Sequence, residues 1–188
     1  MSLNLRNYTK ALYSFDHVMK LTNEKTWARK APFAGWTGES IYVHVLDQIK
    51  QVQSQVTSGK NPKGSVKLGA DPYGAWAKLR DQTLEMLDHP GALQRVAHDP
   101  FGPEFGSFPI DGFIGFMAAE LTPHVWDLAR TAKVDDRLDA GLCTASLAAW
   151  KSLPKEVLRS EGFFGPEIKA PKGADAQARL LAFVGRAI

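Results

Sequence analysis

The spacing of apolar residues predicts a first helix from about residue 4 to 22. Four apolar residues share one face of this helix at steps of four, three and four: Tyr8, Leu12, Phe15 and Met19. His17 falls on the opposite face, so we expect its side chain to be exposed. The helix should bury its apolar stripe against the rest of the chain.

A second helix is predicted after a loop, Trp27 to Trp36, that contains proline and glycine. Thr37 is a suitable N-cap with Glu39 in the first turn, and the helix should run to about Thr57. Its apolar stripe consists of Ile41, Val45, Ile49, Val52 and Val56. His44 lies at the edge of that stripe, beside three glutamines: Gln48, Gln51 and Gln55.

A third helix should start with Asp71 as N-cap and Pro72 at the first helical position, and end at His89. Its expected inner face consists of Trp76, Leu79, Thr83 and Met86. From Ala92 to Pro109 the chain is rich in proline, glycine and phenylalanine and lacks a helical period. This composition indicates an irregular or short hairpin-like connection.

A fourth helix should begin near Ile110 and carry two polar residues on its buried face. Its stripe, at steps of three, four, three, four and four, consists of Ile110, Phe113, Met117, Glu120, His124 and Leu128. Pro123 removes the hydrogen bond to the carbonyl of Ala119, so it should kink the helix beside the two polar residues. The alternative is that Pro123 only bends a long helix around its neighbours.

The C-terminal part predicts two more helices, at about residues 138–153 and Ala174–Arg186, the second after the loop Glu161–Gly173. Cys143, Leu147 and Trp150 share a face of the first of them. No linker or internal repeat divides the chain. We therefore expect one all-α domain over residues 1–188, built from four main antiparallel helices with additional C-terminal helices.

Composition narrows the class of protein. The 188 residues are 44% apolar and 23% charged, and five Trp, ten Phe and four Tyr supply large side chains for a core. The net charge is +3, but basic and acidic residues are interleaved, so we expect no nucleic-acid partner. With one cysteine, charged residues throughout Met1–Lys20 and no long apolar run, we expect a cytoplasmic protein without signal peptide or membrane segment.

Glu120 and His124 are the main candidates for chemistry. Four residues apart on a helix, they project one turn apart from the same face, where both can bind one divalent metal ion. His44 is a reasonable third ligand from another helix, and two histidines with one carboxylate leave positions open for water or substrate. The alternative is a hydrogen-bonded or surface pair. A buried unpaired carboxylate costs several kcal/mol, which favours a cation at Glu120.

The sequence gives weaker support to other candidates for a functional site. His89 fits the C-terminus of a helix, and His98 is an outside candidate for a pocket. Cys143 has helical partners that favour a packed small apolar residue over a nucleophile. Asp127 can either orient a metal ligand or pair with Arg130 on the helix surface. The sequence has no glycine-rich phosphate loop, no GxSxG and no CxxC.

Several segments in a fixed order resemble the DinB/YfiT-like superfamily of metalloenzymes. They are Pro32-Phe33-Ala34-Gly35-Trp36-Thr37, His44 within Tyr42-Val43-His44-Val45-Leu46, Glu120-Leu121, His124-Val125-Trp126-Asp127-Leu128-Ala129-Arg130 and Phe164-Gly165-Pro166. Within the superfamily the chain is most similar to the N-terminal domain of mycothiol-dependent maleylpyruvate isomerases and their uncharacterised actinobacterial relatives. The resemblance covers nearly the whole chain.

The resemblance implies an up-down-down-up four-helix bundle with zinc or nickel bound by His44, Glu120 and His124. It also implies a cytoplasmic protein, often a homodimer, that acts on a small molecule. Two positions depart from the family: Phe33 stands where a cysteine is frequent, and Pro123 precedes the second metal histidine. The isomerase proper also has a C-terminal domain for which we expect no counterpart here.

The resulting expectation is a divalent-metal-dependent enzyme of the thiol-dependent isomerase or S-transferase type, with a low-molecular-weight thiol such as mycothiol as cofactor. A thiolate bound to the metal would be the reactive species. One alternative is a hydrolase in which the same metal activates water. The other is a non-enzymatic metal-binding or interaction protein.

Overall fold

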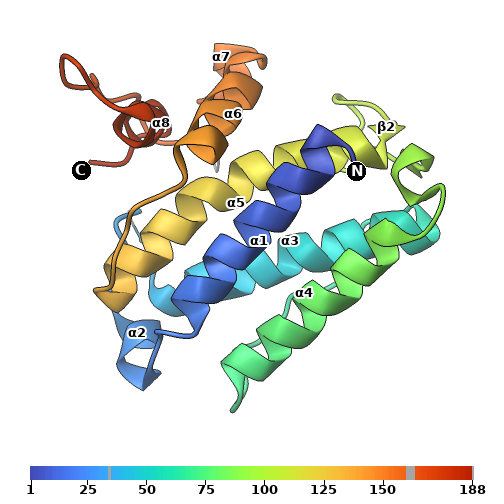
Figure 1. Cartoon of the computed structure of the whole chain (residues 1–188), viewed down its shortest axis with the longest axis horizontal. Coiled ribbons are helices and arrows are strands. Elements are labelled where there is room, and N and C mark those ends of the chain that lie inside the picture. Colours follow the sequence, from blue (N-terminus) through green and yellow to red (C-terminus); the bar gives the residue numbers. More distant parts are fainter. Residues whose placement is uncertain (34, 160–163, 188) are drawn as a thin grey trace.

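The computed structural model describes residues 1–33, 35–159 and 164–187 and is mostly helical, as the sequence predicts. The long helices are α1 (Leu3–Met19), α3 (Gly38–Ser58), α4 (Pro72–Asp88) and α5 (Ile110–Ala132). α1 and α5 run in one direction and α3 and α4 in the opposite one (Figure 1). α1 contacts α5 and α4, and α3 contacts the same two helices, so the four surround one core.

The shorter elements are α2 (Glu24–Ala28), η1 (Ala92–Gln94), β1 (Val96–Ala97), β2 (Phe108–Pro109), α6 (Ala140–Lys151), α7 (Lys155–Leu158) and α8 (Ala176–Phe183). β1 and β2 form an antiparallel pair, so the hairpin-like connection is confirmed. The loop predicted from Trp27 is wrong at its start, because α2 extends to Ala28. Asn23 and Thr26 begin this helix with a capping box that the sequence interpretation did not use.

The predicted helix starts at Thr37 and Asp71 are confirmed. The Thr37 hydroxyl accepts from the backbone N–H of Ser40, and the Ser40 hydroxyl accepts in return from that of Thr37. Asp71 caps α4 by accepting from the N–H of Gly74 at 2.8 Å. Gly59 ends α3 in the left-handed conformation, with φ 64°. Local chemistry therefore sets the length of the helix that carries His44.

The predicted apolar stripes of α1 and α3 are buried along their whole length. In α4 two residues expected on the inner face are only partly buried: Leu79 and Met86. Arg80 is buried instead, because it donates to Asp16 of α1, which also accepts from Trp76 Nε1 at 3.0 Å. This ion pair turns α4 so that Leu87 enters the core.

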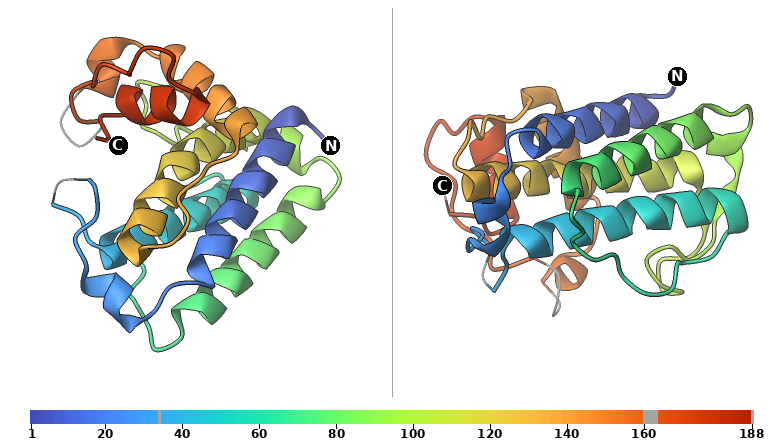
Figure 2. Two further views of the ribbon diagram at one scale, coloured as in Figure 1. Left: turned by 60° about the vertical axis from the view of Figure 1, so that its left-hand side comes forward. Right: turned by 90° about the horizontal axis from the view of Figure 1, so that it is seen from below.

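The C-terminal helix α6 packs against α5, and α8 packs against α6 in turn (Figure 2). They have an apolar cluster of their own, consisting of Ala119, Cys143, Trp150, Leu158, Leu180, Phe183 and Val184. α8 ends at Phe183, three residues before the predicted end at Arg186. The chain turns after the helix at Gly185, which has φ 78°. Of the predicted loop Glu161–Gly173, residues 161–163 lie outside the described residues. Residues 164–173, the rest of that predicted loop, contain neither helix nor strand.

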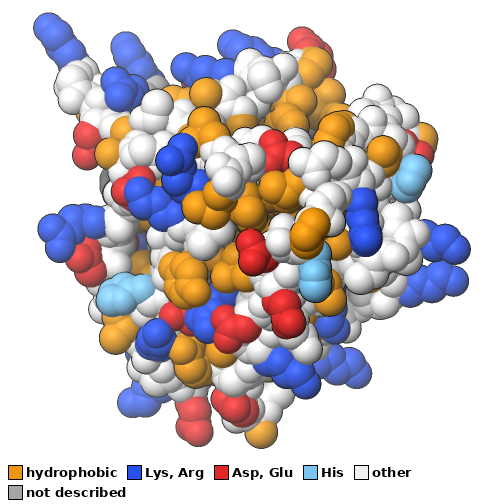
Figure 3. Space-filling model, turned by 45° about the vertical axis from the view of Figure 1, so that its right-hand side comes forward, with side chains coloured by type: hydrophobic (Ala, Val, Ile, Leu, Met, Phe, Trp, Pro, Cys, Tyr) orange, Lys and Arg blue, Asp and Glu red, His pale blue; other side chains and the backbone are white. Residues whose placement is uncertain are grey.

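The surface carries both signs of charge. On the face drawn in Figure 3, lysine and arginine side chains are interspersed with aspartate and glutamate. Within the described ranges, no helix combines the length and the apolar character needed to cross a bilayer.

Candidate metal centre

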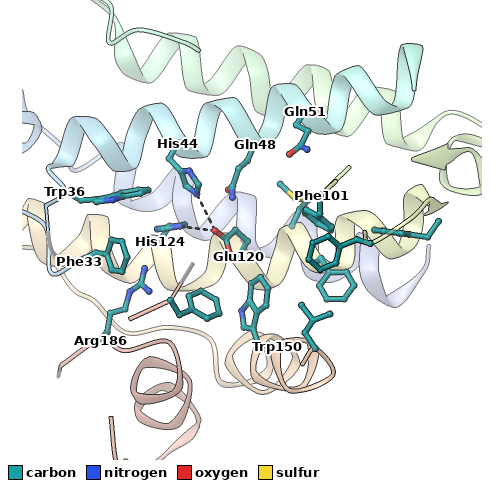
Figure 4. A pocket seen from close by; sticks show the side chains of 16 residues that line it. Phe33, Trp36, His44, Gln48, Gln51, Phe101, Glu120, His124, Trp150 and Arg186 are labelled. Atoms are coloured by element: carbon teal, nitrogen blue, oxygen red, sulfur yellow. Dashed lines mark hydrogen bonds and ion pairs between the residues drawn. The ribbon is translucent and has the colours of Figure 1, made fainter. Parts of the chain in front are cut away.

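The structure brings the three predicted ligands together. His44 comes from α3, and Glu120 and His124 come from α5 one turn apart (Figure 4). One donor atom from each lies within 4.8 Å of the others. Glu120 Oε1 is 3.3 Å from His44 Nε2 and 3.4 Å from His124 Nε2.

These spacings fit the donor set of a divalent metal. Zinc binds imidazole nitrogen and carboxylate oxygen at about 2.0–2.2 Å, so two tetrahedral ligand atoms lie roughly 3.4 Å apart. His124 is buried, whereas the side chains of Glu120 and His44 are 21% and 34% exposed. The three donors therefore have a buried side and an open side.

Contacts within this group shift the pKa values of Glu120 and His124. Burial alone would raise the pKa of Glu120, but the hydrogen bonds with His124 and His44 outweigh it and lower the pKa. Burial would likewise lower the pKa of His124, yet its contacts with Asp127 and Glu120 raise it. The carboxylate of Glu120 is thus held in its charged form, the form in which it binds metals.

Asp127 supports His124 from behind. Asp127 Oδ2 is 3.1 Å from His124 Nδ1, which turns Nε2 of the same ring toward Glu120. Arg186, after α8, donates to Asp127 from Nη2 at 2.8 Å and from Nε at 3.3 Å. The structure places Asp127 where it can orient His124, and a role of His124 as a metal ligand stays a prediction. The alternative pairing with Arg130 is wrong, because Arg130 contacts Asp136 at 3.1 Å.

A turn before α3 covers the two histidines. Trp36 stacks on His124 with ring centroids 5.6 Å apart and 4° between the planes, and it meets His44 edge-on at 5.0 Å. Phe33 packs against Trp36, and the Arg186 guanidinium lies over the Phe33 ring at 4.5 Å. Phe33 thus links the turn to the C-terminal segment.

A cavity of about 470 Å³ opens beside the three ligands. Aromatic side chains make up much of its wall. Its described lining consists of Phe33, Trp36, His44, Gln48, Gln51, Phe101, Phe105, Phe108, Phe116, Met117, Glu120, His124, Trp150, Leu153, Phe164 and Arg186. The open side of the ligand set therefore faces a space large enough for a small molecule.

Pro123 has a specific structural consequence. It leaves the carbonyl of Ala119 without its helical donor, as the sequence predicts. In the structure α5 continues through Pro123, and that carbonyl accepts from Ser146 Oγ at 2.7 Å and from Trp150 Nε1 at 3.3 Å. Both donors lie on α6. The proline therefore creates an attachment point for α6 one residue before Glu120.

The other sequence candidates lie apart from this site. His17, His89 and His98 are exposed and do not line the cavity. Cys143 is fully buried, and burial raises the pKa of its thiol to about 12, which confirms the prediction of a packed residue. Arg186 and the aromatic wall escaped the sequence interpretation. The sequence places Arg186 at the end of a helix, and three of the phenylalanines, Phe101, Phe105 and Phe108, lie in a segment without periodicity.

Comparison of the chain with protein-family models, with curated proteins and with solved structures found no match.

Proposed function

We propose that the chain is a metal-dependent enzyme that holds one divalent ion, zinc or nickel, with His44, Glu120 and His124. The observation that carries the proposal is a set of two imidazoles and one carboxylate, with donor atoms within 4.8 Å, at the wall of a 470 Å³ cavity. A structural metal site is usually closed by four protein ligands. Three ligands beside a cavity favour an enzyme over a non-enzymatic metal-binding protein.

A zinc ion held by such ligands lowers the pKa of a bound water to about 7 and deprotonates a bound thiol outright. The chain itself holds no reactive thiol at the site, because Cys143 is buried outside the cavity. A thiol that acts at this site would therefore have to come from a cofactor. We propose a low-molecular-weight thiol such as mycothiol, in an isomerase or S-transferase type of reaction.

The cavity lining favours a thiol over water as the nucleophile. Apart from the three ligands, the polar side chains among its described residues are Gln48, Gln51 and Arg186. None of these side chains accepts a proton at neutral pH. A thiol gives up its proton on binding and needs no such base, whereas hydrolysis usually relies on one. Metal-dependent hydrolysis remains the alternative for the same site.

The DinB/YfiT-like assignment belongs to this proposal. The directions of α1, α3, α4 and α5 along the chain correspond to an up-down-down-up four-helix bundle, which supports it (Figure 1). A homodimer, a small-molecule substrate, a cytoplasmic location and the lack of a nucleic-acid partner stay predictions. Each follows from the sequence or from the resemblance.

The test of the metal site is the metal content of protein purified without a nickel tag. We expect close to one equivalent of zinc or nickel per chain. His44→Ala and His124→Ala should lose the ion, and the control His89→Ala, which changes an exposed histidine outside the cavity, should keep it. Metal-free wild-type protein, or full retention by both site variants, would contradict the proposal.

The test of the thiol is the absorption of cobalt-substituted protein. Mycothiol or a close analogue at millimolar concentration should change the spectrum, since a sulfur ligand alters the cobalt environment. The oxygen analogue of the same molecule serves as the control and should leave the spectrum unchanged. Equal spectra with and without the thiol would favour the hydrolase.

A further inference from the structure

The cavity has two chemically different ends. Trp36, His44 and His124 lie at one end, and Phe101 lies at the other, as Figure 4 shows. Its volume of about 470 Å³ falls in the range of small-molecule sites, which is roughly 300–1,000 Å³. The end away from the proposed ligands therefore has room for the body of a substrate.

That end is lined by aromatic rings from several elements. Phe116 comes from α5, Phe108 from β2 and Trp150 from α6, and Phe101 lies in the connection between β1 and β2. The Phe101 ring centroid is 6.0 Å from those of Phe108 and Phe116, and Phe116 is 6.3 Å from Trp150. Ring centroids at these separations are typical of favourable aromatic packing. The rings form a continuous wall that matches a planar apolar group.

Two glutamines of α3 hold the connection in place. The Gln51 amide donates to the carbonyl of Pro100. The Gln55 amide donates to the carbonyl of His98 at 3.1 Å, and its oxygen accepts from the His98 N–H at 2.9 Å. Phe101 is therefore anchored at the cavity, which it lines, even though the residue is 37% exposed.

The charges around the cavity are already paired. Arg186 is the one arginine or lysine among the described lining residues, and its Nε, Nη1 and Nη2 donate to Asp127 and to the carbonyl of Val184. The Trp150 N–H donates to Ala119. Gln48 lines the cavity one turn after His44, and its amide makes no hydrogen bond with a described residue. The cavity thus offers a free amide and apolar rings, and no unpaired cation.

We propose that this cavity binds substrates with an uncharged aromatic body, which packs against Phe101, Phe108 and Phe116 while Gln48 hydrogen-bonds a polar group on the ring. That such a ligand is a substrate rests on the function proposed above. The binding itself needs no metal, because the wall and the amide belong to the chain.

Calorimetric titration of metal-free protein with 2-naphthol tests the proposal. We expect saturable binding of one molecule with a dissociation constant of about 0.1–1 mM, ordinary for a ligand of this size. Naphthalene-1,5-disulfonate has the same rings with two negative charges, and it should bind at least about tenfold more weakly, since desolvated anions need a cation. Absence of 2-naphthol binding, or tighter binding of the disulfonate, would overturn the proposal.

Two variants locate the binding. Phe101→Ala should weaken 2-naphthol binding about 3- to 10-fold through the lost ring contact. Gln48→Leu should weaken it by a similar factor through the lost hydrogen bond. Tyr13→Ala is the matched control, because Tyr13 is an aromatic residue, 52% exposed, outside the cavity. Equal affinities for Phe101→Ala and Tyr13→Ala would place the probe elsewhere and contradict the proposal.

The two proposals fail in different ways. If the protein holds metal but does not bind 2-naphthol, the proposal of an aromatic ligand is contradicted, and the proposal of a metal-dependent enzyme stands. If the protein binds 2-naphthol in the predicted place but purifies without metal, the proposal of a metal-dependent enzyme is contradicted, and the proposal of an aromatic ligand stands.

Discussion

Arg186 donates two hydrogen bonds to Asp127 across 59 residues of sequence, to Oδ2 at 2.8 Å and to Oδ1 at 3.3 Å. Both residues are buried. Asp127 in turn contacts Nδ1 of His124, so a residue near the end of the chain positions a proposed metal ligand. The C-terminal segment is therefore part of the site and more than a cover for α5.

Asp127→Asn should weaken metal binding about 10- to 100-fold, the usual effect of removing a carboxylate behind a ligating histidine. The amide keeps the size of the side chain but no longer favours the proton on Nδ1 of His124. Competition with a chromophoric chelator measures the affinity, and the helical circular dichroism spectrum checks the fold. Asp136→Asn, which changes the exposed pair with Arg130, is the control. Unchanged metal affinity in Asp127→Asn would contradict a role of Asp127 in metal binding.

Ser146→Ala should lower the free energy of unfolding by about 1 kcal/mol, since the Ala119 carbonyl loses the shorter of its two hydrogen bonds. Thr144→Ala on the same helix removes an exposed hydroxyl that bonds only within α6 and should cost less. Urea denaturation of both variants measures the difference. If the two variants unfold at the same urea concentration, the bond to Ala119 contributes no stability.

Tyr8→Phe should stabilise the protein by about 1 kcal/mol, because it removes a buried hydroxyl that has no partner among the described residues. Tyr42→Phe is the paired comparison. The Tyr42 hydroxyl donates to the Pro72 carbonyl at 3.3 Å, so its loss should destabilise by a similar amount. Thermal unfolding of the two variants should therefore move in opposite directions. A lower melting temperature for Tyr8→Phe would show that its hydroxyl is satisfied in solution.

Asp16 should make stability depend on acid pH. Burial alone would raise its pKa, but hydrogen bonds from Lys20 and Trp76 and the charge of Arg80 outweigh it and hold the pKa below its ordinary value. The unfolded chain then binds a proton first as the pH falls, so the contribution is complete above about pH 4 and is lost through the lower folded pKa.

Urea denaturation between pH 6 and the most acidic pH at which the protein still folds tests this coupling. Wild-type stability should fall more steeply below about pH 4 than that of Asp16→Asn, which has no carboxyl group to titrate. Asp81→Asn is the control, because the exposed Asp81 also contacts Arg80. Parallel pH profiles for wild type and Asp16→Asn would contradict the lowered pKa.

Periodicity was enough to predict the long helices and the position of Glu120 and His124 on one face. These two residues stand out because they interrupt an apolar stripe at helical spacing, and the stripe is buried on both sides of them. That inference needs only the geometry of one helix. His44 borders the stripe of another helix, so periodicity made it only a reasonable third ligand, and the resemblance implied the full set.

The sequence alone did not predict contacts between residues that lie far apart in the chain. The face of α4 is set by the ion pair between Arg80 and Asp16, which are 64 residues apart. The role of Arg186 depends on the turn at Gly185 after α8, and no local pattern shows that this turn brings Arg186 to Asp127. The aromatic wall likewise combines Phe101 and Phe108, from a segment without helical period, with Phe116 of α5 and Trp150 of α6, and these rings meet only once the elements have packed.

The carbonyl freed by Pro123 has a consequence for how the molecule opens. If α6 detached, the Ala119 carbonyl would lose both donors, Ser146 and Trp150, and water would have to enter in the middle of α5, one residue before Glu120. Opening of α6 is then coupled to disturbance of the helix beneath it, in contrast to the independent fraying of a peripheral helix. We expect the amide protons of α6 and of central α5 to exchange with solvent together, as one cooperative unit.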